Sequence, residues 1–174
     1  MSSVPPHSEH ELDEILALPA GRRIEPLVAL GRQVLAGSAR DNGLSEQLIE
    51  ALLELIRNCA GDSQQRLQMG EVLGYLGDPR LRVPENPAYW KRIEMPEHPF
   101  LVGRHPVTNM EFRNWVDAGG YRDDAHWSPE GLAWRDAQDK LWPELAEDPE
   151  VATLVVPNQP VVGLTWYEAE AYAT

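Results

Sequence analysis

The stretch PVTNMEF, residues 106–112, decides how the second half of the chain folds. Thr108 and Glu111 stand three residues apart, which is the spacing of a capping box. In that motif the threonine hydroxyl accepts a backbone N–H of the first helical turn, and the glutamate accepts the N–H of the threonine. Phe112, Trp115 and Val116 follow at helical spacing. The stretch therefore predicts a helix that starts after Thr108 and carries an aromatic face.

The same pattern returns near the end of the chain, in PVVGLTWYEAEAYA at residues 160–173. Thr165 and Glu168 form the second predicted capping box, and the alanines that follow favour a helix. The apolar run at residues 160–164 predicts a strand before it. Two further strands are predicted at residues 89–95 and 99–103, where apolar residues are bounded by proline or glycine.

Between the two boxes lies a connection, residues 121–160, that we expect to be irregular but packed. It carries three tryptophans, Trp127, Trp134 and Trp142. Large aromatic side chains at this density favour burial over a floppy loop.

These phrases, in this order, resemble the N-terminal part of the sulfatase-modifying factor family, whose best-known members are formylglycine-generating enzymes. The resemblance spans about residues 96–174. The residues that carry it, to which we assign structural roles, are Pro106, Val107, Thr108, Asn109, Phe112, Trp127, Trp134, Asn158, Pro160, Val161, Trp166, Glu168 and Ala169.

The resemblance implies a C-type-lectin-like α+β fold. The family includes copper-dependent oxidases that convert a cysteine to formylglycine, iron-dependent sulfoxide synthases and non-catalytic binding domains. Its core motif, calcium ligands and paired cysteines belong to a later part of the domain. We therefore expect residues 96–174 to be an incomplete, truncated domain. No catalytic, cofactor-binding or metal-binding residue is expected in this chain, and copper or calcium would belong to the intact protein.

The first half is rich in leucine and predicts four short helices with apolar stripes. The stripes lie within residues 12–16, 24–35, 48–56 and 67–76; Ser45 can cap the third helix, and Ser63 precedes the stripe of the fourth. The ending LGDPR, residues 76–80, resembles one HEAT-type repeat unit, and a generic four-helix bundle is the alternative.

The predicted organisation is a disordered tail at residues 1–7, helical hairpins at 8–83, a linker with the first extended segment at 84–95, and the truncated domain at 96–174. Residues 84–174 hold twelve of the thirteen aromatic residues, including all six tryptophans. The fold class is thus α+β, with a small all-α region before an incomplete lectin-like fold.

The composition of the chain limits the classes of partner that it can bind. The formal net charge is −13, which disfavours nucleic acid and anionic membrane surfaces. No apolar run approaches the ~20 residues of a membrane-spanning helix, and no secretory signal is visible, so we expect a soluble cytoplasmic protein.

Several cysteine, histidine and acidic residues are candidates for reactive, metal-binding or partner-binding sites. Cys59 ends a helical stripe and is expected to be a small buried side chain. His7 and His10 are expected in a solvated tail, and His98 and His105 on the surface or in packing roles. The cluster Asp123, Asp124 and His126 has ligand types but no distant partner. The acidic stretch 136–150 is either a solvated face or a partner-facing patch.

Two functions stay open at this point. One is a non-catalytic binding or regulatory module with a helical adaptor, whose partner is a protein or the missing C-terminal half of the domain. The other is the N-terminal part of a metal-dependent oxidase, formylglycine-generating or otherwise sulfur-oxidising, with its catalytic segment beyond residue 174. We expect apolar side chains such as Phe112, Trp115 and Trp166 to lack a partner surface within residues 96–174.

Overall fold

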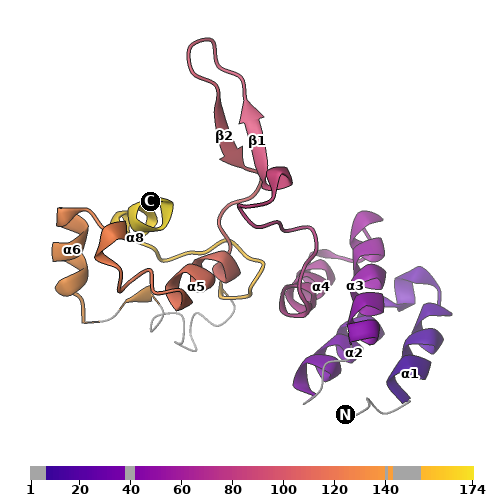
Figure 1. The fold of residues 1–174 in the computed structure, drawn as a ribbon. Coiled ribbons are helices and arrows are strands. Elements are labelled where there is room, and N and C mark those ends of the chain that lie inside the picture. The colour runs from indigo at the N-terminus through magenta and orange to yellow at the C-terminus, as the bar shows by residue number, and fades with distance from the viewer. Residues whose placement is uncertain (1–6, 38–41, 140, 143–153) are drawn as a thin grey trace. The chain divides into compact units, whose positions relative to one another are not determined.

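The computed structural model describes residues 7–37, 42–139, 141–142 and 154–174 (Figure 1). The chain divides into two compact units, Met1–Pro79 and Arg80–Thr174, and each is considered by itself. Within the described residues, no helix is both long enough and apolar enough to cross a membrane.

The first unit is built only of helices in its described residues. They are α1 (His7–Leu16), the 3-10 helix η1 (Ala20–Arg22), α2 (Ile24–Ala36), α3 (Asn42–Arg57) and α4 (Ser63–Leu76). Helix α2 packs against both α3 and α4, and α1 packs against α2 and α3. The predicted helices are confirmed, whereas the likeness to a HEAT repeat and the generic bundle both stay predictions.

An aliphatic core holds these helices together. Gly31 of α2 faces Val72 of α4 so closely that an added Cβ would overlap the valine side chain. The two helices can therefore approach more closely than larger side chains would allow. The buried core residues are Leu12, Ile15, Ile24, Leu27, Val28, Leu30, Leu44, Leu48, Ala51, Leu52, Leu53, Leu55, Met69, Val72 and Leu73.

The start of one helix differs from the prediction. Helix α3 begins at Asn42, so Ser45 lies inside it, where its hydroxyl is buried without a hydrogen bond to any described residue. Helix α4 begins at Ser63 and is capped by Asp62: Asp62 Oδ1 accepts the Gln65 N–H at 2.8 Å, and Gln65 Oε1 accepts the Asp62 N–H at 3.1 Å. The stop at Gly77 is confirmed, because its φ of 104° is one that residues with a Cβ rarely adopt.

The second unit opens with the 3-10 helix η2 (Pro87–Tyr89) and a hairpin of β1 (Trp90–Ile93) and β2 (Phe100–Gly103). The strands pair antiparallel, from Trp90 opposite Gly103 to Ile93 opposite Phe100 (Figure 1). Both predicted strands are confirmed with shorter bounds.

Short helices follow the hairpin: α5 (Asn109–Asp117), the 3-10 helix η3 (Asp124–His126), α6 (Pro129–Asp136) and α8 (Trp166–Ala173). Helix α6 packs against α8. Together with the hairpin they confirm a mixed fold of helices and a small antiparallel sheet, consistent with the α+β class.

The predicted strand at residues 160–164 is wrong. That segment makes a single antiparallel bridge, from Pro160 to Thr108. Proline has no N–H to donate to a ladder, and Gly163, with a φ of 76°, leaves the extended conformation. An apolar run alone does not distinguish a strand from a packed, irregular segment.

Candidate functional site

Asn109 joins two parts of the second unit that are far apart in the sequence. Its side-chain Nδ2 donates to the carbonyl oxygens of Leu154 and Val156 at 2.8 and 3.0 Å, across separations of 45 and 47 residues. Its backbone N–H donates to the Gln159 carbonyl at 2.9 Å. The asparagine is buried, so these bonds satisfy donors of its own that are shielded from water.

The backbone beside Asn109 continues this connection. Val161 N–H donates to the Val107 carbonyl at 2.9 Å, and Met110 N–H donates to the Pro157 carbonyl at 3.0 Å. The structure thus brings together the two motif stretches that sequence reasoning singled out separately. Their motif residues are Pro106, Val107, Thr108 and Asn109 on one side and Asn158, Pro160 and Val161 on the other.

Both predicted capping boxes are present. Thr108 N–H donates to Glu111 Oε2 at 2.9 Å, and Thr165 N–H donates to Glu168 Oε2 at 2.7 Å. Each threonine hydroxyl accepts the N–H of the glutamate three residues on, at 3.3 and 3.4 Å. The boxes fix where α5 and α8 begin.

Phe112 lies at the centre of an aromatic cluster and is fully buried. This corrects the expectation that Phe112 would lack a partner surface, since other rings of the same unit enclose it. Trp115 is also packed against this cluster, whereas Trp166 is 69% exposed, as expected. The rings around Phe112, with their centroid distances, are Trp142 (5.0 Å), Trp115 (5.2 Å), Tyr172 (5.6 Å) and Tyr121 (6.5 Å).

A stack of three rings extends the cluster to α6 and α8. Trp127 stacks on Trp134 with centroids 6.3 Å apart, and Trp134 stacks on Tyr167 at 5.7 Å. Trp127 Nε1 donates to the Gly120 carbonyl at 2.9 Å. An added Cβ at Gly120 would overlap the Trp115 ring, so only glycine fits there.

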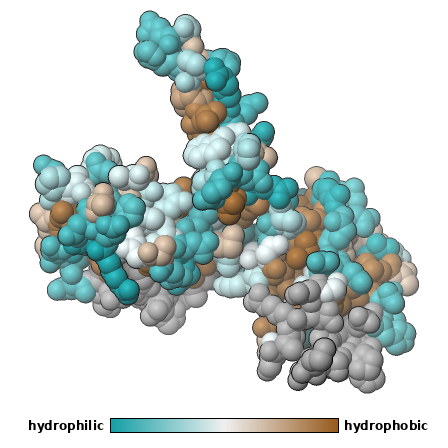
Figure 2. Space-filling view, in the orientation of Figure 1, coloured by the Kyte–Doolittle hydropathy of each residue, from teal (hydrophilic) through white to brown (hydrophobic). Residues whose placement is uncertain are grey.

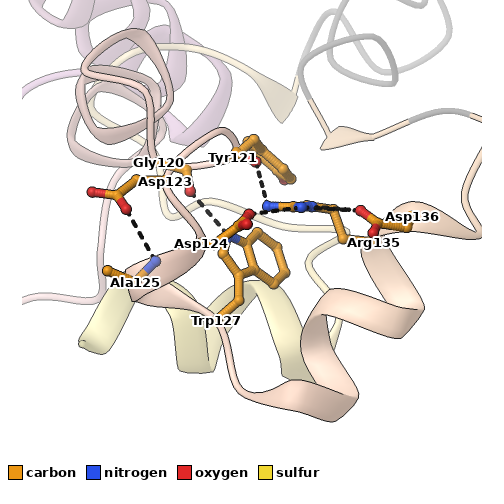
Figure 3. A network of polar contacts seen from close by, with 8 residues as sticks. All are labelled: Gly120, Tyr121, Asp123, Asp124, Ala125, Trp127, Arg135 and Asp136. Carbon is orange, nitrogen blue, oxygen red and sulfur yellow. Dashed lines mark hydrogen bonds and ion pairs between the residues drawn. The ribbon is translucent and has the colours of Figure 1, made fainter.

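Arg135 ties the loop before η3 to α6 (Figure 3). Its guanidinium donates to the Tyr121 carbonyl at 2.9 Å and pairs with Asp124 at 2.9 Å and Asp136 at 3.0 Å. Burial lowers the pKa of Arg135, but the two carboxylates outweigh it and raise the pKa above its usual value. The guanidinium also lies 5.5 Å from the Trp127 ring centre.

Tyr121 donates its hydroxyl to Glu168 Oε1 inside the cluster, where Glu168 is only 2% exposed. Burial, followed by the hydrogen bond and the charge of Glu168, raises the pKa of Tyr121 well above 10. Glu168 therefore does two things at once: one oxygen caps α8 and the other accepts the buried phenol.

An open groove of about 890 Å³ lies beside the cluster. One wall comes from the hairpin, with Trp90 and Val102, and the other from α5 and α8, with Phe112 and Tyr172. Most of the lining is apolar, and Arg104 is the one basic side chain with a permanent charge among the lining residues. Figure 2 shows hydrophobic residues, in brown, on the hairpin that stands at the top of the view. This groove is the candidate functional site.

Two phenols line the groove close to Glu111. Burial, together with the charge of Glu111, raises the pKa of Tyr89 to about 12. Burial, Glu111 and Glu85 raise the pKa of Tyr172. Both phenols therefore stay protonated in the folded protein at neutral pH.

The candidate metal ligands Asp123 and Asp124 contact other protein groups. Asp123 accepts the Ala125 N–H at 3.0 Å and lies 3.9 Å from His126, while Asp124 pairs with Arg135. In the described part of the chain, no three His, Cys, Asp or Glu side chains come together as a ligand set. His98 and His105 are exposed.

Cys59 is exposed, which corrects the expectation of a buried thiol. Helix α3 ends at Arg57, and Cys59 takes a φ of 52° in the turn that follows. The chain has no other cysteine. A copper site of two thiolates therefore does not fit these residues.

His10 differs from its prediction, and only part of the acidic stretch 136–150 is described by the structure. His10 lies within α1 and is 3.6 Å from Glu14, so it is not part of a tail. Within the acidic stretch 136–150, Trp142 is buried and its Nε1 donates to the Val162 carbonyl at 3.1 Å. Residues 140 and 143–150 of that stretch lie outside the described residues.

The sequence did not lead us to predict helix α6 or the side-chain contacts between distant parts of the second unit. The signal for α6 was present: Ser128 accepts the Gly131 N–H at 3.2 Å, and Pro129 occupies the first helical position. The pairs Tyr121–Glu168 and Arg135–Asp124 had no local signal, because their partners depend on how the chain folds back.

One family model matches more than half of the chain. The family described as "Sulfatase-modifying factor enzyme 1-like domain" matches residues 60–174, more than half of the chain. No solved structure gives a significant match.

Three similar proteins show the extent of the likeness. Hercynine oxygenase of Mycolicibacterium thermoresistibile is 39% identical, over 42% of this chain and 18% of that protein. Hercynine oxygenase of Mycolicibacterium smegmatis is 36% identical, over 59% of this chain and 25% of that protein. The formylglycine-generating enzyme of Thermomonospora curvata is 33% identical, over 44% of this chain and 32% of that protein. The chain thus spans less than a third of the length of each relative.

Proposed function

The chain belongs to the sulfatase-modifying factor family, and from that membership we propose that residues 80–174 serve as a non-catalytic binding module. In this proposal the groove beside the hairpin accepts an extended, acidic polypeptide, and the helical first unit acts as an adaptor. The observation that carries it is a groove of about 890 Å³ with an exposed strand in one wall.

The hairpin favours a polypeptide over a small molecule. Each strand has one pairing partner in the described residues, so the other edge of β2 retains unpaired backbone groups. An extended segment can add a strand there by main-chain hydrogen bonds and place alternate side chains in the groove. Val102 lines the groove and is 43% exposed, which leaves apolar surface for that contact.

The charge of the hairpin region favours an acidic partner. Residues 80–105 carry five Lys or Arg and three Glu, whereas the rest of the chain carries 10 basic and 25 acidic residues. An acidic segment would thus meet the most basic part of an otherwise acidic chain, which favours encounter and orientation.

The test uses a synthetic peptide of alternating valine and glutamate, followed by fluorescence anisotropy. Val102→Asp should weaken its binding about tenfold, or ~1.4 kcal/mol, because Val102 lines the groove. Leu101→Asp is the matched control, since neighbouring residues of a strand point to opposite faces. Equal loss in both variants, or equal binding of a valine–lysine peptide, would contradict the proposal.

A second candidate is an enzyme that oxidises a sulfur-containing substrate, and the printed names of the relatives favour it. Its catalytic groups would come from polypeptide outside these 174 residues, because the chain's one thiol lies in the first unit. Oxygen consumption with hercynine or a cysteine peptide, measured on the full-length gene product, separates the two candidates. Turnover of either substrate would show that the function is enzymatic and not that of a non-catalytic binding module.

A further inference from the structure

A small second cavity of about 190 Å³ lies in the basic part of the second unit. Its lining contains three arginines, a histidine and a tyrosine, and no carboxylate. The lining residues are Arg80, Arg82, Ala88, Tyr89, Arg104 and His105.

Backbone contacts hold this cavity in shape. Arg104 Nε donates to the Ala88 carbonyl at 2.8 Å, and Arg104 N–H donates to the Tyr89 carbonyl at 2.9 Å. Asn86 Oδ1 accepts the Ala88 N–H at 2.9 Å, which fixes the turn that precedes the tyrosine. One nitrogen of the Arg104 guanidinium is thereby anchored, and its two terminal nitrogens remain available as donors.

Four arginines elsewhere in the chain have a carboxylate partner. Arg32, Arg57, Arg92 and Arg135 each pair with a carboxylate at 3.1 Å or less. Arg82 and Arg104, by contrast, form no ion pair with any described residue. The nearby Glu85 does not line the cavity.

Grouping arginine side chains in a cavity whose lining holds no carboxylate is electrostatically unfavourable. An anion that binds there would relieve the repulsion. We propose that this cavity is a binding site for phosphate, either free or as a monoester.

Size and donor geometry favour phosphate. The cavity is smaller than the ~300–1,000 Å³ typical of pockets for drug-sized ligands, so it accepts a small group. Guanidinium groups match the oxygens of phosphate in pairs, and a dianion gains more from several cations than a carboxylate does. Tyr89, Arg104 and His105 line the larger groove as well, so an apolar body attached to the phosphate has a place to go.

Isothermal titration calorimetry of the full chain with inorganic phosphate at low ionic strength tests the site. Arg82→Ala and Arg104→Lys should each weaken phosphate binding about tenfold. Arg104→Lys keeps the charge and loses the fork of donors, so it separates geometry from net charge. Arg66→Ala, an exposed arginine of α4 in the first unit, is the control and should change affinity less than about twofold.

Phenyl phosphate distinguishes the two sources of the ligand. Tighter binding than inorganic phosphate would identify a monoester with an apolar body, and equal binding would identify free phosphate. Absence of phosphate binding, equal binding of acetate, or an equal loss in Arg66→Ala would overturn the proposal. Since none of these probes is a polypeptide, the outcome is independent of whether the groove binds peptides.

Discussion

The two units of this chain are stabilised in different ways. The first buries aliphatic side chains between four helices, which pack both on their neighbours in sequence and, as α2 does on α4, on more distant ones. The second buries aromatic rings between short helices and loops, and it depends on hydrogen bonds such as those of Asn109, which span 45 and 47 residues. Each helix of the first unit therefore shows its apolar stripe in the local sequence, whereas the hydrogen bonds of Asn109 in the second unit have no local signal.

This difference can be measured because the two units carry different reporters. All six tryptophans lie in the second unit, so tryptophan fluorescence follows that unit alone. The longest helices lie in the first unit, which dominates the far-ultraviolet circular dichroism of the described residues. The first four of the five predictions below use these two signals.

Phe112→Ala should have the largest effect. It removes a fully buried ring that contacts four others, at a cost of about 3–5 kcal/mol to the second unit. In denaturant titrations the fluorescence transition should move to lower concentration, while the circular dichroism of the first unit stays in place.

Leu52→Ala provides the reciprocal experiment in the aliphatic core. It should destabilise the first unit by about 2–5 kcal/mol and leave the fluorescence transition unchanged. If each substitution moves both transitions equally, the two units unfold as one cooperative block, and the comparison drawn above is wrong.

Tyr121→Phe should cost the second unit about 1–3 kcal/mol, because it takes a donor away from the buried Glu168 carboxylate. The change is read from the fluorescence transition. Tyr75→Phe in the first unit is the control: this tyrosine is exposed, so the loss of its hydroxyl should stay within about 0.5 kcal/mol.

Each unit contains a capping box, so the same local device can be removed from either one. Thr108→Ala should destabilise the second unit by about 1 kcal/mol, and Asp62→Ala should destabilise the first by a similar amount. Fluorescence should respond to Thr108→Ala only. A response to Asp62→Ala would show that the cap of α4 supports both units.

Alkaline pH should give the smallest effect, and it should act on the second unit. The pKa of Tyr89 is raised to about 12 from an ordinary value of 10, so between these values the unfolded chain releases a proton that the folded chain keeps. The stability that this group contributes is present below pH 10 and falls as the pH rises toward 12.

The phenolate absorbance of the folded protein should contain a late-titrating component that Tyr89→Phe removes. Tyr121 and Tyr172 also have raised pKa values, so some pH dependence should remain in that variant. An unchanged absorbance titration in Tyr89→Phe would contradict the prediction.

The sequence predicted the features that depend on near neighbours. The two Thr-x-x-Glu boxes, the hairpin strands and the helices of the first unit all follow from residues within a few positions of one another. The apolar run at 160–164 failed because its neighbour in space is the Thr108 segment, which gives it a single bridge.

Most of the candidate site could not be predicted from residues that are neighbours in the sequence. The groove is formed by β2, α5 and α8, and nothing near Val102 indicates that Tyr172 will lie across from it. Arg82 and Arg104 are likewise separated by the whole hairpin, so their shared cavity appears only once β1 and β2 have paired. The motif residues around Thr108 and Pro160 position this site, but most of the groove lining lies elsewhere.

Because Asn109 bonds to residues 45 and 47 positions later in the chain, these contacts form late during synthesis. The ribosome delivers the chain from its amino end, so every helix of the first unit has been made before Asn109 is added. The asparagine must then wait for Leu154 and Val156 to leave the exit tunnel before it can make its bonds. In the interval the tryptophan-rich segment is exposed while the leucine-rich segment can already be folded. A nascent chain stalled near residue 140 is therefore the species on which we expect chaperones to act.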